Sequence, residues 1–263
     1  MLFIKNSGIK EVFGPMDISS ESNRTTEINI VYIKGEGADF KIGSFCCFII
    51  NQKREGKRMK KYVITIARGF GSGGKEIGVK LGERLGIPCY EQQLLRMASE
   101  QSGINEALFN LADEKLEVKD KLKGLPFNYV VEPSDKRFTS NNNLFNIQSE
   151  LIRKLAGEES FIVIGKCADY VLKDFVNVAS FYIEAPRADC VASITKKMGV
   201  TEAEAHRLIE KTDKYRADYY KHYTKGNYWT NPVNYDMTLN SARVGRDRCV
   251  DVIEHYVKVK FGL

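Results

Sequence analysis

Seven consecutive residues, Gly69-Phe-Gly-Ser-Gly-Gly-Lys75, have the composition of a loop that wraps a chain of phosphates. Glycines let the backbone turn so that several N–H groups point inward, and the missing side chains leave room for an anion. The lysine supplies a mobile positive charge for the outer phosphates. The sequence therefore predicts a nucleotide-binding site made of Gly69, Phe70, Gly71, Ser72, Gly73, Gly74, Lys75 and Glu76.

The sequence on both sides supplies the elements that such a loop requires. Residues 62–67 are apolar and β-branched, which predicts a strand. Ile77, Leu81 and Leu85 recur at helical spacing, and Gly86 predicts the end of that helix. A helix that starts directly after the loop adds its positive N-terminal end to the phosphate site.

The same glycines also fit a second pattern. Gly69, Gly71 and Gly74 satisfy G-x-G-x-x-G, which is typical of dinucleotide-binding turns, and Glu91 stands where that fold places an acidic residue. Lys75 favours the phosphate-chain interpretation, because a dinucleotide turn does not need a lysine. A glycine-rich turn without any ligand is the third interpretation.

Polar residues follow two further predicted strands. Lys166 and Asp169 come after the strand predicted at 161–165. Ligands bind at the carboxyl ends of parallel strands, so we expect both side chains to bind the acceptor, with a helix cap as the alternative role for Asp169. Glu91 ends another predicted strand and either binds the acceptor or a metal-bound water, or starts the next helix.

A basic cluster lies in a predicted helical lid at about 206–232. Positive charge stabilises a phosphoryl group in transfer, so Lys75, Lys214 and Arg216 are predicted to be catalytic and Lys211 to bind substrate. Positions 211 and 214 share a helix face, whereas 216 lies off it. Charge pattern alone favours a solvated helix face balanced by neighbouring acids.

Composition limits the classes of protein. The 263 residues are 43% hydrophobic and carry a net charge of +6, which suits a domain of moderate size plus an appendage. The charge is mild, as expected for a protein that handles phosphorylated small molecules, and too diffuse to indicate nucleic acid. No apolar run reaches about 18 residues, so no membrane segment is expected. Six cysteines without metal-ligand spacing predict free thiols and a cytoplasmic location.

From residue 61 onward, strand and helix signals alternate, which predicts an α/β fold with a mostly parallel sheet. A helical insertion is expected at about 91–150, and its stretch 126–143 is predicted to be a loop because it contains prolines and three successive asparagines. A last strand is predicted near 235–240, followed by a terminal helix at about 244–258.

Residues 1–60 are predicted to be an N-terminal extension, because they lack the alternating strand and helix signals that begin at residue 61. Runs at 27–33 and 40–50 predict a small β-hairpin. A basic linker follows. Met59 stands directly before the first strand of the phosphate-loop unit, so we expect that translation could begin there and that residues 1–58 are dispensable for activity.

Four segments in the same order, Ile64–Gly78, Leu85–Glu91, Ile164–Tyr170 and Trp229–Asn240, together resemble the cytidylate kinase-like family of P-loop proteins over about residues 61–260. The resemblance implies the three-layer P-loop fold over residues 61–263, with a helical acceptor-binding insertion and a helical lid. It also implies transfer of the γ-phosphoryl group of ATP to a nucleoside monophosphate, CMP or dCMP, with the help of Mg²⁺.

The chain departs from the family pattern at several positions. Glu76 stands where a Ser or Thr normally contacts Mg²⁺, and its carboxylate could either bind the metal or repel the phosphates. Lys166 replaces a more usual arginine, and the insertion lacks the arginines expected for reading an acceptor. These departures keep two alternatives open: an ATP-binding regulatory protein and a kinase of another small-molecule acceptor. The G-x-G-x-x-G pattern keeps a third open, an NAD-dependent oxidoreductase.

Overall fold

The computed structural model describes residues 10–15, 29–34, 61–114, 126 and 129–263. The chain divides into two units, Met1–Met59 and Lys60–Leu263. In the first unit, β1 (Lys10–Pro15) pairs antiparallel with β2 (Asn29–Lys34). β2 matches the strand predicted at 27–33, but its described partner is β1. The other predicted strand, 40–50, the linker and Met59 lie outside the described residues.

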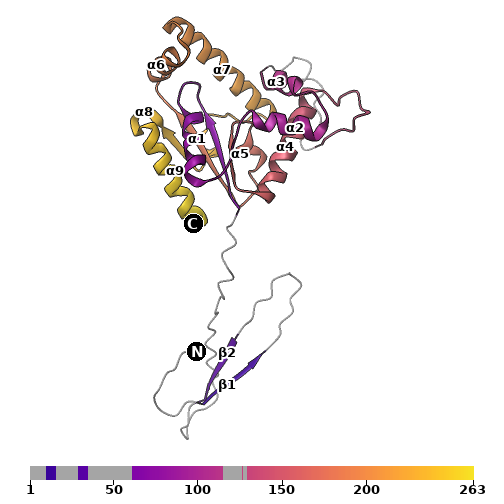
Figure 1. Cartoon of the computed structure of the whole chain (residues 1–263), viewed down its shortest axis with the longest axis vertical. Helices are drawn as coiled ribbons and strands as arrows, with labels where there is room; N and C mark the ends of the chain where they lie inside the picture. Colours follow the sequence, from indigo (N-terminus) through magenta and orange to yellow (C-terminus); the bar gives the residue numbers. More distant parts are fainter. Residues whose placement is uncertain (1–9, 16–28, 35–60, 115–125, 127–128) are drawn as a thin grey trace. The chain divides into compact units, whose positions relative to one another are not determined.

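The second unit is built on a five-stranded sheet in the order β4-β5-β3-β6-β7, with every neighbouring pair parallel (Figure 1). The strands are β3 (Val63–Arg68), β4 (Cys89–Tyr90), β5 (Phe161–Ile164), β6 (Val178–Glu184) and β7 (Met237–Asn240). The predicted parallel α/β sheet is therefore confirmed. β5 lies between β3 and β4, whereas in the dinucleotide-binding fold the first two strands are neighbours.

Helices cover both faces of this sheet (Figure 1). They are α1 (Gly74–Leu85), α2 (Gln93–Ser102), α3 (Glu106–Glu114), α4 (Asn141–Glu158), α5 (Ala168–Val171), α6 (Arg187–Met198), α7 (Glu202–Tyr223), α8 (Ser241–Val244) and α9 (Arg246–Phe261). α1 ends as predicted, where Gly86 adopts a left-handed conformation with φ 66°. Over the described ranges, no helix is both long and apolar enough to cross a bilayer.

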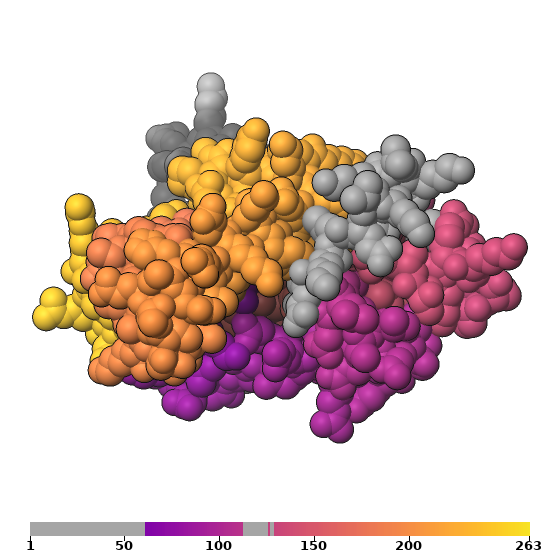
Figure 2. All heavy atoms as spheres, turned by 90° about the horizontal axis from the view of Figure 1, so that it is seen from above, coloured from indigo at the N-terminus to yellow at the C-terminus, as the bar shows by residue number. Residues whose placement is uncertain are grey.

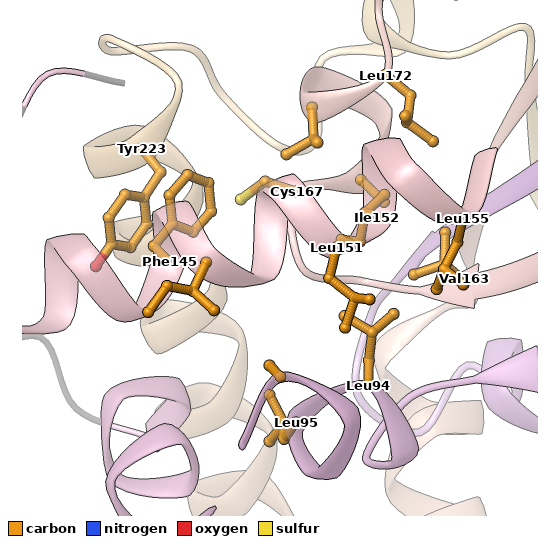
Figure 3. Packing of buried hydrophobic residues seen from close by; sticks show 14 of the residues in the cluster. Leu94, Leu95, Phe145, Leu151, Ile152, Leu155, Val163, Cys167, Leu172 and Tyr223 are labelled. Carbon is orange, nitrogen blue, oxygen red and sulfur yellow. The ribbon is translucent and has the colours of Figure 1, made fainter. Parts of the chain in front are cut away.

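Alternate side chains of β3 enter two different cores. Ile64 and Ile66 pack with α1 and α9, while Val63 belongs to the cluster formed with α2, α4 and α7. Figure 3 shows this second cluster, in which Phe145 of α4 stacks on Tyr223 of α7 with ring centroids 3.8 Å apart. Burial of each such side chain stabilises the fold by about 1.5–3 kcal/mol. α7 is thus anchored to the same core as the strand that precedes the phosphate loop.

One predicted boundary was wrong. The asparagines at 141–143, predicted to end a loop, form the first turn of α4, and Ser140 caps this helix by accepting a hydrogen bond from the Asn143 N–H. The predicted end of the insertion, residue 150, falls inside this helix. The terminal helix predicted at 244–258 is confirmed as α9, and Gly245 with φ 88° separates it from the short helix α8.

Candidate functional site

The glycine-rich loop lies where the sequence predicted it, between the central strand β3 and the start of α1. Gly71 and Gly73 have φ angles of 91° and 85°, which residues with a β-carbon rarely adopt. A β-carbon at Gly69 would collide with the carboxylate of Glu184 at the end of β6. The loop conformation therefore favours glycine at positions 71 and 73, whereas a side chain at position 69 would require the Glu184 carboxylate to move.

The loop fits the phosphates of a nucleotide. The first amides of α1 have no acceptor within their own helix, and the helix N-terminus favours negative charge. Ser72 is buried and donates its hydroxyl hydrogen to backbone oxygens, 2.9 Å from Gly69 O and 3.0 Å from Ile183 O, so it holds the loop in shape. Backbone N–H groups and Lys75 are the groups available to contact a phosphate chain.

Lys75 is held at the edge of the loop by Glu91. Lys75 Nζ lies 2.5 Å from one carboxylate oxygen of Glu91, and Arg68 Nη2 lies 2.8 Å from the other. Burial alone would raise the pKa of Glu91, but the hydrogen bond from Lys75 and the charges of both cations outweigh burial and lower this pKa. Glu91 is therefore an ionised partner for two cations, each suited to bind a phosphate.

α7 contacts the loop directly. The Phe70 N–H donates to Asp213 Oδ1 at 2.8 Å, and Arg216 Nη1 donates to the Arg68 carbonyl at 3.0 Å. The Arg216 guanidinium also lies over the Phe70 ring, 5.6 Å from its centroid. Burial raises the pKa of Asp213, while the Phe70 N–H and Arg216 oppose that rise. A helix that grips the loop in this way can place Arg216 beside a bound phosphate.

The end of β5 forms the other side of the site. Lys166 and Cys167 have left-handed backbone conformations, φ 59° and 52°, which for residues other than glycine store strain typical of functional sites. Asp169 on α5 accepts a hydrogen bond from the hydroxyl of Tyr220 at 2.6 Å. Burial raises the pKa of Asp169 to about 6, although the Tyr220 hydrogen bond lowers it in part.

Most of these groups line a single cavity of about 850 Å³. Figure 2 views this face of the molecule, where α6 and α7 (orange) meet the phosphate loop and α1 (purple) across a hollow. Most of the predicted site residues line it: Gly69, Phe70, Gly71, Gly73, Gly74, Lys75, Glu76, Glu91, Lys166, Asp169, Lys211 and Arg216. Aromatic side chains of Tyr215, Tyr219, Tyr220 and Trp229 add an apolar wall.

Two predicted site residues do not line this cavity. Ser72 is buried beneath the loop. Lys214 is exposed and does not line the cavity, so the structure does not bring it together there with Lys211. The cavity face of α7 carries Lys211, Thr212, Tyr215 and Arg216, which matches the 3.6-residue period of the helix.

Glu76 does not have the surroundings of a magnesium ligand. Its two carboxylate oxygens contact Arg246 and, at 3.4 Å, Lys197. Within the part of the chain that the structure describes, no three His, Cys, Asp or Glu side chains gather to hold a metal ion. The residues present thus fit a nucleotide but do not fit a metal bound through Glu76.

Sequence reasoning missed Arg68, Asp213 and Arg246. Arg68 directly follows the strand predicted at 62–67 and is the last residue of β3, so its place at a strand end was an available signal. Asp213 lies in the basic segment, where charge pattern alone makes it one of the acids that balance the cations. Arg246 is 170 positions from Glu76 in the sequence, and no local pattern connects the two.

A phosphate loop between a central parallel strand and a helix, beside a strand-end polar site, defines a P-loop protein. The chain belongs to the cytidylate kinase-like family, whose sequence model matches residues 63–243. This membership supports a phosphotransferase that acts on nucleotides or other small molecules.

Comparison with solved structures agrees with the fold. An uncharacterized protein from Eubacterium ventriosum is 26% identical, with a TM-score of 0.56 over 75% of this chain and 99% of that one. A shikimate kinase from Bacteroides thetaiotaomicron is 11% identical, with a TM-score of 0.43 over 75% of this chain and 98% of that one, a likeness too weak to support inference. No curated protein matched the chain.

Proposed function

We propose that this protein is a nucleotide kinase that transfers the γ-phosphoryl group of ATP to a nucleoside monophosphate, with CMP or dCMP as the first candidates. The observation that carries the proposal is the shared cavity: the phosphate loop with Lys75 and the strand-end site with Lys166 and Asp169 line the same space. A donor held at the loop would therefore face an acceptor held at the end of β5.

Each residue has a role that its position supports. The loop amides and Lys75 would bind the phosphates of ATP, which supplies the phosphoryl group that passes to an acceptor phosphate oxygen as its bond to the β-phosphate breaks. Arg216 and Lys211 of α7 would stabilise the charge of the transferred group and exclude water. Lys166 and Arg68 would bind the acceptor phosphate.

The aromatic wall and Asp169 favour a nucleobase as part of the acceptor. Tyr215, Tyr219 and Trp229 offer apolar ring surface, and the Asp169 carboxylate can accept a hydrogen bond from an exocyclic amine such as that of cytosine. We expect the reaction to take place in the cytoplasm, where nucleotides are available and the free cysteines of the described part stay reduced.

The test is a screen of ATP-dependent phosphorylation across CMP, dCMP, UMP, AMP, GMP and a set of small acids and alcohols. Lys75→Ala should lower turnover by on the order of 10²–10³-fold, because it removes a preorganised charge from the phosphate site. Lys80→Ala is a matched control on the same helix, since Lys80 pairs with Asp247. Near-normal activity of Lys75→Ala would contradict the proposed function.

A second candidate, an ATP-binding regulatory protein, is favoured by the internal pairing of the loop. The Phe70 N–H already donates a hydrogen bond to Asp213, and Lys75 already forms an ion pair with Glu91. This candidate predicts ATP binding without transfer to any compound in the screen, so the same experiment separates the two.

A further inference from the structure

Glu76, in the first turn of α1, directly follows the lysine of the phosphate loop. A carboxylate there is favoured by the helix N-terminus when no ligand is bound, but it lies close to the space in which a phosphate chain must sit. Unless its charge is offset, it repels every phosphate that the loop attracts. A positive charge from a distant part of the sequence balances this carboxylate.

Arg246, the first residue of α9, forms an ion pair with Glu76 through Nη1. Lys197 of α6 approaches the other carboxylate oxygen at 3.4 Å. The ion pair with Arg246 is the shorter of the two. Arg246 is therefore the principal partner of the Glu76 charge.

Arg246 also supports the loop itself. Its Nη2 donates to the hydroxyl of Ser193 at 2.7 Å and lies 3.4 Å from the carbonyl oxygen of Gly71. A β-carbon at Gly73 would collide with the guanidinium, which shows how closely the arginine lies against the loop. The planar fork of an arginine suits such simultaneous contacts. One side chain thus connects α9, α6 and α1 behind the phosphate loop.

We propose that Arg246 is a positioning residue for phosphate binding: it neutralises Glu76 and supports the glycine-rich loop from behind, so that a loop without the usual hydroxyl after its lysine still accepts a polyphosphate. The inference rests on the proposed function only in requiring that the loop binds a polyphosphate. In this inference the partner of the Glu76 carboxylate is Arg246 rather than a metal ion.

The test compares ATP affinity, measured by titration calorimetry at fixed ionic strength with and without Mg²⁺, in Arg246→Met, Glu76→Gln and the double variant. Arg246→Met should bind ATP on the order of tenfold more weakly, because it leaves a carboxylate with only Lys197 beside the phosphates. The double variant should bind ATP more tightly than Arg246→Met, since removal of the carboxylate removes the need to neutralise it, but more weakly than wild type, because the contacts of Arg246 with Gly71 and Ser193 are still lost. Glu76→Gln alone should not weaken binding.

Arg248→Met is the matched control, because Arg248 is an exposed arginine two positions further along α9. It removes the same charge from the same helix and should leave ATP affinity unchanged. The side chains of Arg246 and Glu76 are 37% and 40% exposed, so their ion pair contributes little to stability and the variants should fold. Thermal unfolding checks this, and Arg246→Lys, which keeps the charge, should bind ATP more tightly than Arg246→Met.

Several outcomes would overturn the inference. Equal weakening by Arg246→Met and Arg248→Met would show a general charge effect, and a double variant as weak as Arg246→Met would show that neutralisation of Glu76 is not the role. Loss of binding by Glu76→Gln only when Mg²⁺ is present would assign Glu76 to the metal. If the wild-type protein binds ATP but phosphorylates nothing, the proposed function fails and the inference stands. If it binds neither ATP nor inorganic triphosphate, both fail.

Discussion

In the structure, the cations and the loop amide of the candidate phosphate site are paired with carboxylates of the protein itself. Glu91 binds Lys75 and Arg68, and Asp213 accepts the Phe70 N–H. Under the proposed function, a nucleotide would replace these carboxylates with its own phosphate oxygens. Because carboxylates and phosphates present similar acceptors, the exchange would keep each cation and amide paired.

Asp169 gives a prediction that depends on pH. Burial raises its pKa to about 6 in the folded protein, above the value of about 3.9 for an unfolded chain. Between these two values the unfolded chain has released the proton and the folded protein keeps it, so rising pH destabilises the wild type. Asp169→Asn lacks this loss, so its free energy of unfolding relative to wild type should rise by about 2 kcal/mol from pH 4 to pH 7.

Urea unfolding of both proteins at pH 4 and pH 7 measures this difference. Asp218→Asn, which changes an exposed carboxylate of α7, is the control and should show a much smaller change with pH. If the gap between Asp169→Asn and wild type is the same at both pH values, burial does not keep the carboxyl group protonated in the folded state.

The elements around the loop were predictable because their signals are local. The β-branched run before Gly69, the helical spacing after it and Gly86 predicted the bounds of β3 and α1 to within two residues. The start of α4 was not predictable in this way, since three asparagines in succession usually indicate a turn. Asn143 and Asn146 instead bury their amides and bind the backbone of the preceding segment, with Asn146 Nδ2 2.8 Å from Tyr129 O. Tertiary contacts override the local preference.

The role of Asn143 gives a prediction for this element. Its side chain accepts from the Val131 N–H at 2.9 Å and donates to the Phe138 carbonyl at 2.8 Å. Asn143→Ala leaves both backbone groups without their partner in a buried place, so the free energy of unfolding should fall by on the order of 2 kcal/mol. Chemical denaturation measures the loss. Lys154→Ala, on the exposed face of α4, should change stability little, and an equal effect from both variants would contradict this account.

At the scale of the whole chain, the site depends on residues far apart in sequence that the sheet order brings together. Asp169 and Tyr220 are 51 positions apart, and Phe70 and Asp213 are 143 apart. A periodicity or a motif contains no information about such pairs, so sequence reasoning found the loop and the strand ends but assigned Lys214 to the site and overlooked Asp213. All of these residues belong to the unit Lys60–Leu263.

This division of the chain leads to the last prediction, which concerns residues 1–58. All three core clusters of the described residues and every residue of the cavity lie at or beyond Tyr62. A fragment that begins at Met59 keeps all of the apolar surface that these cores bury, so it should unfold cooperatively at the same temperature as the corresponding transition of the full chain. It should also bind ATP with the same affinity, because no cavity residue is removed. Calorimetry and ATP titration of the two proteins test this, and an insoluble fragment, or one that binds ATP more weakly, would show that the first unit supports the site.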